Sequence, residues 1–290
     1  MLYLSRFTFP DGDDEFDFRR TVKRTCYDSL YPFGVLSAKG LLRLEFEPLT
    51  ILYGGNGCGK TTALNVMAEK LALRRDAPYN RSNFFEDYVR LCRYDARAPI
   101  PAASRVITSD DVFDFMLDLR AMNGGIDLRR EELFQEYMDN RHGEFRLRSM
   151  EDYEQLKRVN RARSGTQSRY VRKYLKDNVR EHSNGESAFL CFTQRIGENA
   201  LYLLDEPENS LSPTKQRELA GFLADSARFF GCQFVIATHS PFLLAMPGAK
   251  VYDLDADPAC PRRWTELPAV RAYRDFFAAH AADFEGEDDP

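Results

Sequence analysis

The stretch ILYGGNGCGKTT at residues 51–62 constrains the fold more than any other part of the chain. From Gly54 to Thr61 it follows the pattern G-x-x-x-x-G-K-[ST], in which glycines let the backbone wrap closely with its N–H groups facing inward. An apolar run precedes the loop and an amphipathic segment follows it, which is the strand–loop–helix context of a phosphate-binding loop (P-loop). A plain glycine-rich turn is the alternative, but a chance match is expected in only about one chain in a hundred of this length. The stretch therefore predicts an α/β fold with an anion site.

Each residue type in the loop has a chemical reason to be there. Lys60 is expected to reach the β- and γ-phosphates of a nucleotide, and the Thr61 hydroxyl is expected to bind Mg²⁺. The helix expected over 61–73 points the positive end of its dipole at the anion. The residues expected to contact nucleotide are Gly54, Gly55, Asn56, Gly57, Cys58, Gly59, Lys60, Thr61 and Thr62.

Two later apolar strands also end in polar residues. The run LYLL precedes Asp205 and Glu206, and the run FVIAT precedes His239. Strands that alternate with helices predict a mostly parallel sheet, whose ligands bind at the carboxyl ends of the strands, so these exits and Lys60 are expected in one crevice. There an aspartate can hold Mg²⁺, the next glutamate can accept a proton from an attacking water, and imidazole can contact a γ-phosphate. An acidic turn and a polar strand cap are the alternatives.

Composition excludes several classes of protein. The 290 residues carry a net charge of only −5 and 43% hydrophobic residues, so the chain can build a large core and has no overall polybasic character. No apolar run approaches the length of a membrane span, and the first fifteen residues do not predict a signal peptide. Six cysteines are scattered without a C-x-x-C pair, which predicts reduced thiols and a cytoplasmic protein.

The P-loop, an hhhhDEP strand and a THSP histidine, in this order, resemble the ATP-binding-cassette (ABC) ATPases. More narrowly, the segments ILYGGNGCGKTT, LYLLDEPENSLSP and ATHSPFLL resemble the soluble branch that contains SMC, RecF-like and OLD-like proteins and many short "AAA family" ATPases. The resemblance covers most of the chain and implies ATP and Mg²⁺ as cofactors and a homodimer that encloses two ATP molecules. It implies ATP hydrolysis with Glu206 as general base, Lys60 and His239 at the γ-phosphate, and Thr61 and Asp205 at the metal.

The family also has a signature motif, resembling LSGGQ, before its Asp-Glu strand. The segment HSNGES at 182–187 occupies this place and precedes an expected helix. In the family, the serine and glycine here contact the γ-phosphate held by the other protomer, which implies that role for Ser183 and Gly185. Taken alone, the segment is explained equally well by a helix N-cap at Ser183 or Ser187.

Two features depart from the family pattern. Family members usually carry a glutamine after an early strand that helps to ligate Mg²⁺, but residues 62–133 contain none. The matching exit is RVITSDD, so Ser109 or Asp110 is the expected substitute, with Asp110 as a helix N-cap as the alternative. The loop after Glu206 also lacks the aspartate of transporter cassettes. Tyr31 and Phe33 are candidates for stacking on adenine, with core packing as their alternative.

The expected organisation is one ABC-type ATPase domain over 1–290. It carries an inserted helical lobe at 111–186 that ends at the signature motif, and its residues 281–290 form an acidic tail that is expected to be disordered.

Residues 157–180 hold nine basic residues against one acidic residue, a net charge of +8. A helix expected from Arg169 to Arg180 would gather five of these cations on one face. The functional interpretation is contact with nucleic-acid phosphates. The alternative is a solvated face, or one paired with the acidic segment at 131–140.

Other functions compete with that of a soluble dimeric ATPase. These are the nucleotide-binding subunit of a membrane ABC transporter, a P-loop kinase for a small molecule, and a binding switch whose hydrolysis only times the release of a partner, as in toxin control or phage defence. The last requires an effector in another chain, which the sequence does not identify. Cys58 beside Lys60 and a helix N-terminus is expected to be a reactive thiolate, with an inert small residue as the alternative.

Overall fold

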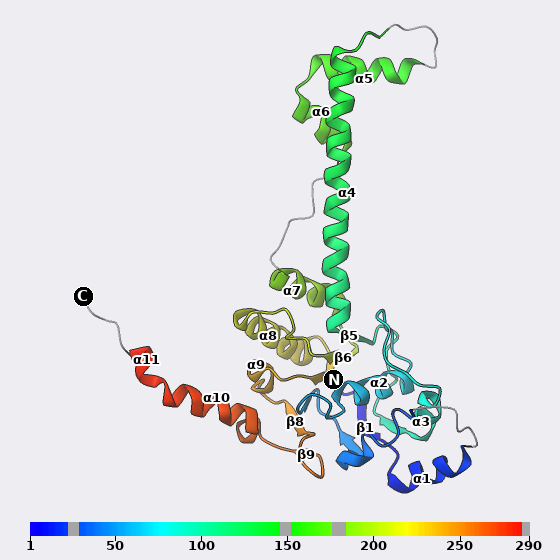
Figure 1. Ribbon diagram of the computed structural model, residues 1–290, viewed down its shortest axis with the longest axis vertical. Helices are drawn as coiled ribbons and strands as arrows, with labels where there is room; N and C mark the ends of the chain where they lie inside the picture. The colour runs from blue at the N-terminus through cyan, green and yellow to red at the C-terminus, as the bar shows by residue number, and fades with distance from the viewer. Residues whose placement is uncertain (23–28, 146–151, 176–183, 286–290) are drawn as a thin grey trace. The chain divides into compact units, whose positions relative to one another are not determined.

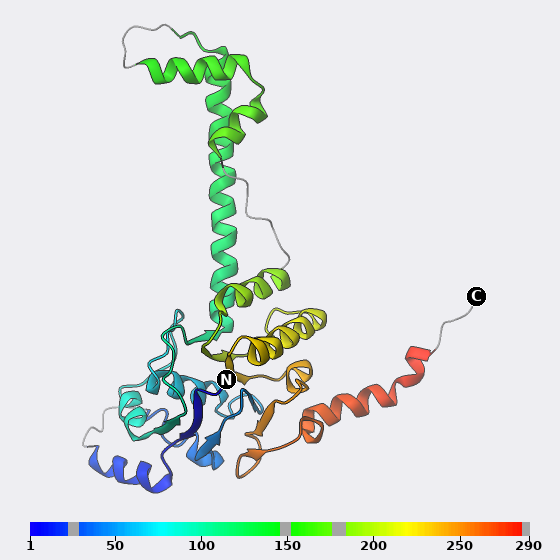
Figure 2. The same cartoon turned by 180° about the vertical axis from the view of Figure 1, so that it is seen from behind.

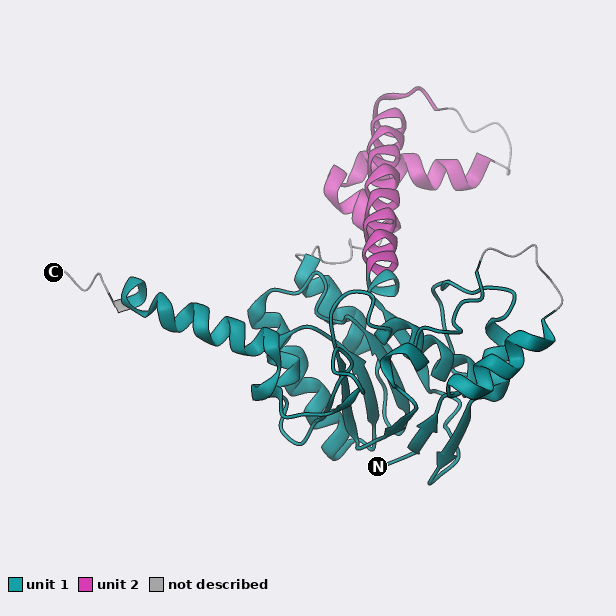
Figure 3. Ribbon diagram, turned by 60° about the horizontal axis from the view of Figure 1, so that its bottom comes forward, with its two compact units in different colours: residues 1–112, 184–290 teal, residues 113–183 magenta. Residues whose placement is uncertain are grey.

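The computed structural model describes residues 1–22, 29–145, 152–175 and 184–285. The chain divides into two compact units, residues 1–112 with 184–290 and residues 113–183 (Figure 3). The second unit falls within the range 111–186 that the sequence suggested for an inserted lobe.

The first unit is built on a six-stranded sheet with the strand order β5–β6–β7–β3–β8–β9 (Figure 1). The first five strands are parallel, and β9 pairs antiparallel with β8, which confirms the mostly parallel sheet. Every residue of the adjacent strands β3 and β7 is buried, as expected where both faces of a parallel sheet are covered. The strands are β3 (Leu49–Tyr53), β5 (Arg105–Thr108), β6 (Leu201–Asp205), β7 (Gln233–Ala237), β8 (Lys250–Asp253) and β9 (Cys260–Pro261).

Helices cover this sheet and can be followed from both sides in Figures 1 and 2. Helix α2 contacts β6 and β7, and α8 contacts β7, α7 and α9. The first unit also holds a C-terminal pair of helices after a short 3₁₀ helix. The helices are α1 (Gly12–Thr21), η1 (Ser37–Lys39), α2 (Lys60–Lys70), α3 (Phe85–Leu91), α7 (Asn184–Arg195), α8 (Pro213–Phe229), α9 (Pro241–Leu244), η3 (Trp264–Glu266), α10 (Pro268–Ala279) and α11 (Ala281–Glu285).

A second, antiparallel sheet has the order β2–β1–β4, formed by β1 (Leu4–Thr8), β2 (Arg43–Glu45) and β4 (Arg93–Ala96). The side chain of Gln233, fully buried in β7, ties it to the main sheet. Its Oε1 accepts hydrogen bonds from the backbone N–H groups of Tyr3 and Leu4 at 2.8 and 2.9 Å, and its Nε2 donates to the Leu4 carbonyl at 2.7 Å. One amide thus satisfies three buried backbone groups of another sheet.

The second unit has a small core of its own. Helix α4 (Ser109–His142) begins in the first unit and continues through the second, which also contains α5 (Tyr153–Ser164) and α6 (Gln167–Tyr174). Leu133 and Tyr137 of α4 pack with Ala162 of α5 and with Tyr170 and Val171 of α6.

Several boundaries differ from those expected. The P-loop helix ends at Lys70 instead of near residue 73. The expected basic helix from Arg169 to Arg180 is wrong in length, because α6 ends at Tyr174 with Leu175 in extended conformation, and residues 176–180 lie outside the described residues. Residues 281–285 of the expected disordered tail form α11, and 286–290 lie outside the described residues.

Replacing the buried amide of Gln233 should destabilise the junction between the sheets. Gln233→Leu keeps the size of the side chain but leaves the Tyr3 and Leu4 N–H groups buried without acceptors, which costs about 2–4 kcal/mol. Urea or thermal unfolding should show this loss, while the matched change Gln155→Leu at an exposed site on α5 should leave stability almost unchanged. Equal stability of the two variants would contradict the prediction.

Candidate nucleotide-binding site

The backbone of the loop between β3 and α2 requires glycine at particular positions. Gly57 and Gly59 have φ values of +79° and +102°, which side chains rarely tolerate. A Cβ at Gly59 would also lie only 2.9 Å from Leu36 Cδ2. Gly59 is the N-cap of α2 and provides no side-chain acceptor, so the first N–H groups of the helix are oriented for an external anion.

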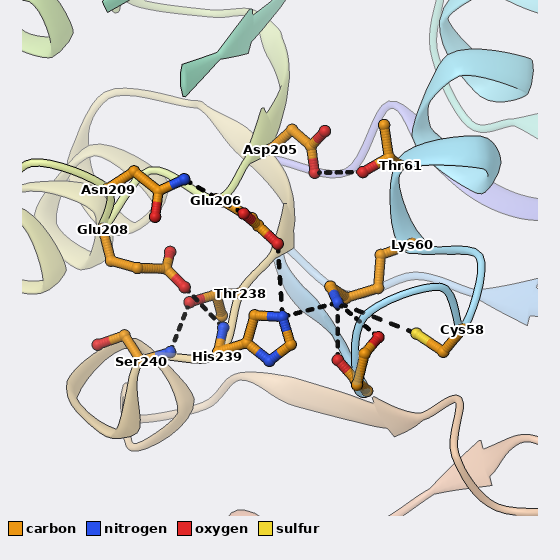
Figure 4. A network of polar contacts seen from close by, with 12 residues as sticks. Cys58, Lys60, Thr61, Asp205, Glu206, Glu208, Asn209, Thr238, His239 and Ser240 are labelled. Carbon is orange, nitrogen blue, oxygen red and sulfur yellow. Dashed lines mark hydrogen bonds and ion pairs between the residues drawn. The ribbon is translucent and has the colours of Figure 1, made fainter. Parts of the chain in front are cut away.

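Lys60 is the buried cation of the site (Figure 4). Its Nζ donates to the carbonyl oxygens of Gly54 at 2.7 Å and Gly55 at 3.1 Å, and lies 2.8 Å from Nε2 of His239. His239 Nε2 is also 3.4 Å from Oε1 of Glu206. Two strand exits that are 179 positions apart in sequence are therefore in direct contact.

Asp205 and Thr61 form the second contact between strand exits. Thr61 Oγ1 donates to Asp205 Oδ1 at 3.2 Å (Figure 4). Burial, with a smaller contribution from the neighbouring Glu206 carboxylate, raises the pKa of Asp205 to about 6, and the hydrogen bond from Thr61 opposes this shift. A hydroxyl and a carboxylate placed in this way suit Mg²⁺, which takes one or two protein carboxylates and completes its shell with water and phosphate oxygens.

Glu206 and Glu208 have different surroundings. Glu206 lies in the left-handed region at φ +48°, with its N–H bonded to the Ala237 carbonyl at 2.9 Å and its Oε2 accepting from Asn209 Nδ2 at 3.2 Å. Glu208 Oε1 accepts from the backbone N–H of His239 at 2.6 Å, and its Oε2 is buried without a hydrogen-bond partner among the residues that the structure describes. Glu208 therefore fixes the backbone of the loop that carries His239, while Glu206 places its carboxylate beside the His239 ring.

A cavity of about 690 Å³ opens beside the first turn of α2. Thr61, Asp205 and Asp110 all line it, which places the expected metal residues around one space. Asp110 lies in the first turn of α4, and the neighbouring Asp111 forms the hydrogen bonds at this helix start, accepting from the Thr108 N–H at 2.8 Å. The N-cap is Thr108, whose Oγ1 accepts from the Asp111 N–H at 3.3 Å, so the alternative of Asp110 as N-cap is wrong.

The two aromatic candidates for adenine stacking differ in environment. Phe33 is buried, and its ring stacks on that of Phe18 with the ring centres 4.4 Å apart. Phe33 therefore packs in the core, which was the alternative to adenine stacking. Tyr31 lines the cavity, and its hydroxyl donates to Thr62 Oγ1 at 3.1 Å.

The signature segment is described only in part. Ser183 lies outside the described residues, and Gly185 is the second residue of α7. A Cβ at Gly185 would lie 3.5 Å from the Ser210 carbonyl, so the start of α7 packs on the loop that follows Glu206.

Sequence reasoning missed Asp255 and Arg75. Asp255, in the loop that follows β8, accepts a hydrogen bond through Oδ2 from the Gly55 N–H at 2.7 Å. This bond stabilises the conformation of the P-loop. Arg75 lines the cavity, with its guanidinium 4.3 Å from the centre of the Tyr79 ring. Asp255 could have been found as a fourth polar exit, at the end of VYDLD, whereas Arg75 gave no signal in the sequence.

A sequence-family comparison supports the second half of this site. Residues 178–245 match the family described as "AAA domain, putative AbiEii toxin, Type IV TA system", and this range includes Gly185, Asp205, Glu206 and His239. Together with the P-loop geometry and the parallel sheet, the match decides the fold. The chain has the fold of a P-loop ABC-type ATPase. The matched range contains two of the segments on which the resemblance to the SMC/RecF-like branch rests, LYLLDEPENSLSP and ATHSPFLL.

Solved structures of ABC ATPases have low similarity to the chain. The dimeric post-hydrolysis state of an ATP-binding cassette bound to ADP and phosphate is 12% identical with a TM-score of 0.36, over 79% of this chain and 92% of that one. The SMC head domain from Pyrococcus furiosus, bound to the C-terminal domain of ScpA, is 12% identical with a TM-score of 0.38, over 81% and 94%. None of the curated protein sequences compared with the chain matches it.

The membrane prediction can be compared with the helices themselves. Among the described residues, no helix combines the length and the apolar character that crossing a bilayer would require.

The expected reactivity of Cys58 is wrong. The thiol is buried, and burial raises its pKa above the ordinary value, which outweighs the opposing effect of Lys60. The helix N-terminus and the lysine therefore do not make it a thiolate at neutral pH.

Alkylation should therefore be slow at Cys58 and faster at Cys260, which is partly exposed. Because burial raises the Cys58 pKa and covers the thiol, its iodoacetamide labelling at pH 7.5 should be at least about ten-fold slower than that of Cys260 and should still be increasing with pH at pH 9. Mass spectrometry of labelled peptides across pH measures both sites in one sample. Faster labelling at Cys58 than at Cys260 at pH 7.5 would show that the thiol is activated after all.

Proposed function

We propose that this protein binds ATP with Mg²⁺, dimerises around the nucleotide, hydrolyses it slowly and acts as a switch. The observation that supports this best is the contact between three separate strand exits. Lys60, His239 and Glu206 form one chain of contacts, and Thr61 and Asp205 form another beside it. Such a convergence of a phosphate-binding cation, a metal-binding pair and a carboxylate suits phosphoryl transfer to water.

Each residue has a distinct role in this proposal. Lys60 turns from the loop carbonyls to the β- and γ-phosphates, because an anion offers it a stronger charge-assisted bond. Thr61 and Asp205 hold Mg²⁺, with Asp110 across the cavity as a further ligand, and the metal neutralises charge on the phosphates. Glu206 accepts a proton from the attacking water, and His239 contacts the γ-phosphate.

The dimer supplies the remaining γ-phosphate contacts in this proposal. The N-terminus of α7, with Ser183 and Gly185, offers a hydroxyl and N–H groups to the nucleotide of the partner. Binding of both ATP molecules then joins the protomers, and hydrolysis separates them. The output is the release or capture of a partner, in DNA maintenance or phage defence.

A Glu206→Gln variant tests catalysis and dimerisation together. The amide cannot act as a base, so ATP binding should persist, turnover should fall by at least about 100-fold, and a dimer should accumulate with ATP and Mg²⁺. Phosphate release and light scattering after size exclusion measure both effects. Glu218→Gln on the exposed face of α8 is the matched control and should behave as the unmodified protein. A monomeric Glu206→Gln variant that still binds ATP would contradict the sandwich dimer.

The rival function is the nucleotide-binding subunit of a membrane transporter. It is supported less well, because the transporter-type aspartate is replaced in the loop after Glu206 and no glutamine precedes α4 in residues 62–108. A small-molecule kinase is also disfavoured, because His239 contacts the catalytic lysine and carboxylate.

Nucleic acid is the proposed partner of the second unit. A cavity of about 270 Å³ between α5 and α6 is lined by three cations, Arg161, Arg169 and Lys173, together with the rings of Tyr170 and Tyr174. Arg161 donates to the Tyr174 hydroxyl, and its guanidinium lies 5.9 Å from the centre of that ring. Cations beside an exposed aromatic ring suit the phosphates and bases of a single strand.

One alternative for this basic face was ion pairing with the acidic residues 131–140. The observed ion pairs are different. Glu132 and Glu136 both pair with Arg129 of their own helix. Within the described part of the chain, no carboxylate forms an ion pair with Arg169 or Lys173.

Neutralising the pocket should weaken binding to nucleic acid. Arg169→Gln with Lys173→Gln should lower affinity for single strands with little sequence dependence and flatten the salt slope by about 0.7 per lost contact. Arg129→Gln with Lys157→Gln removes the same charge from cations that already pair with glutamates, so it should have a smaller effect. Fluorescence anisotropy across salt concentrations measures this. If the unmodified protein shows no salt-sensitive binding at low ionic strength, a protein partner replaces nucleic acid as the leading candidate.

A further inference from the structure

The C-terminal helix α10 presents an apolar face to solvent. None of its twelve residues is buried, although Tyr273, Phe276 and Phe277 are each more than half exposed and belong to one side of the helix. The three charged residues, Arg271, Arg274 and Asp275, occupy the other side. Phe284 of α11 extends the aromatic group, with its ring centre 6.2 Å from that of Phe277. Exposed aromatic clusters of this kind mark interaction surfaces.

An apolar groove of matching chemistry lies in the same unit. Helix α8, the segment after α9 and η3 enclose a cavity of about 570 Å³. Its walls include Gly221 and Ala224 of α8, Phe242 and Ala245 from the region of α9, and Trp264 of η3. One cation and one anion, Arg217 and Asp225, also line it.

Local contacts prevent α10 from filling the groove of its own chain. Leu267, directly before the helix, is fully buried, and the Ala269 N–H donates to the Tyr53 hydroxyl at 3.3 Å. Arg271 Nε also donates to the Thr265 carbonyl at 3.5 Å, so the first turn is fixed beside η3. At 1.5 Å per residue, Phe276 and Phe277 lie about 12 Å along the helix from this anchor. The helix therefore starts at a wall of the groove and carries its aromatic residues beyond it.

We propose that α10 of one copy docks in the groove of a second copy, and that the second copy returns the same contact. A reciprocal exchange buries both apolar surfaces and closes the assembly as a two-fold dimer. Phe276 and Phe277 are the anchors, and Gly221 lets the partner helix approach α8 closely. This interface needs no nucleotide, so it is separate from the ATP sandwich and can be tested when the sandwich is absent.

The first experiment measures self-association without nucleotide. In EDTA, sedimentation of the unmodified protein should give twice the chain mass of 33.4 kDa. Phe276→Ser with Phe277→Ser should weaken association at least about ten-fold, because aromatic anchors dominate interfaces. Ala278→Ser, on the polar side of α10, is the matched control and should have no effect.

A groove variant excludes misfolding as the cause of any loss. Gly221 is an exposed helical glycine, and a Cβ there meets no atom within 4 Å, so Gly221→Gln should fold normally and block the groove. Gly125→Gln has the same helical context in α4 and should leave association unchanged. A monomeric unmodified protein at tens of micromolar, or groove and helix variants that dimerise normally, would overturn the proposal.

Cross-linking identifies which chain provides the helix. A mixture of Ala272→Cys and Gly221→Cys chains should form an interchain disulfide on oxidation, since Ala272 lies on the apolar side of α10. The pair Ala278→Cys and Gly221→Cys should cross-link much less. If one chain carrying both Ala272→Cys and Gly221→Cys cross-links within a monomer, the helix occupies its own groove and the exchange between copies is wrong.

Discussion

The parallel pairing of β3, β7 and β6 is the constraint on which the site depends. Thr50 lies opposite Val235 and Leu203 lies opposite Val235 from the other side, so the three strands end at the same level. Each strand then delivers its polar residues to one edge: Lys60 and Thr61 after β3, Asp205 and Glu206 at the end of β6, and His239 after β7. A one-residue slip of β6 would turn Asp205 to the opposite face of the sheet and break its bond with Thr61.

Charge at this edge is arranged around one buried lysine. Lys60 donates to two carbonyls and lies against an imidazole nitrogen, while the carboxylates of Asp205 and Glu206 lie around it. Burial already raises the pKa of Asp205, so this pocket holds its negative charge at a cost. A metal cation relieves that cost, and a phosphate supplies Lys60 with a charged partner. The site therefore suits a nucleotide together with its metal better than either one alone.

The sequence predicted the parts of the molecule whose chemistry is local. The P-loop depends on glycine conformations and a helix start, and β3, β6 and β7 are continuous apolar runs, so these elements and their polar exits could be identified without coordinates. Asp255 and Arg75 act through contacts with residues far along the chain, which no local pattern encodes. The end of α6 was missed because the charge pattern continues past Tyr174, the last residue of the helix. Cys58 was misjudged because position beside a cation was weighed without burial.

Glu206 has a backbone conformation that is unfavourable for a residue with a side chain. Its φ of +48° costs a side chain with a Cβ about 1 kcal/mol, and glycine or asparagine would adopt this conformation more easily. The surrounding structure fixes it through the bond from its N–H to Ala237 and through Asn209, which binds the carboxylate itself. The left-handed turn lets two consecutive residues place Asp205 beside Thr61 and the Glu206 carboxylate beside His239, although their side chains would point to opposite faces in a regular strand. A strained glutamate held in this way fits the proposed role of its carboxylate as the base that activates water.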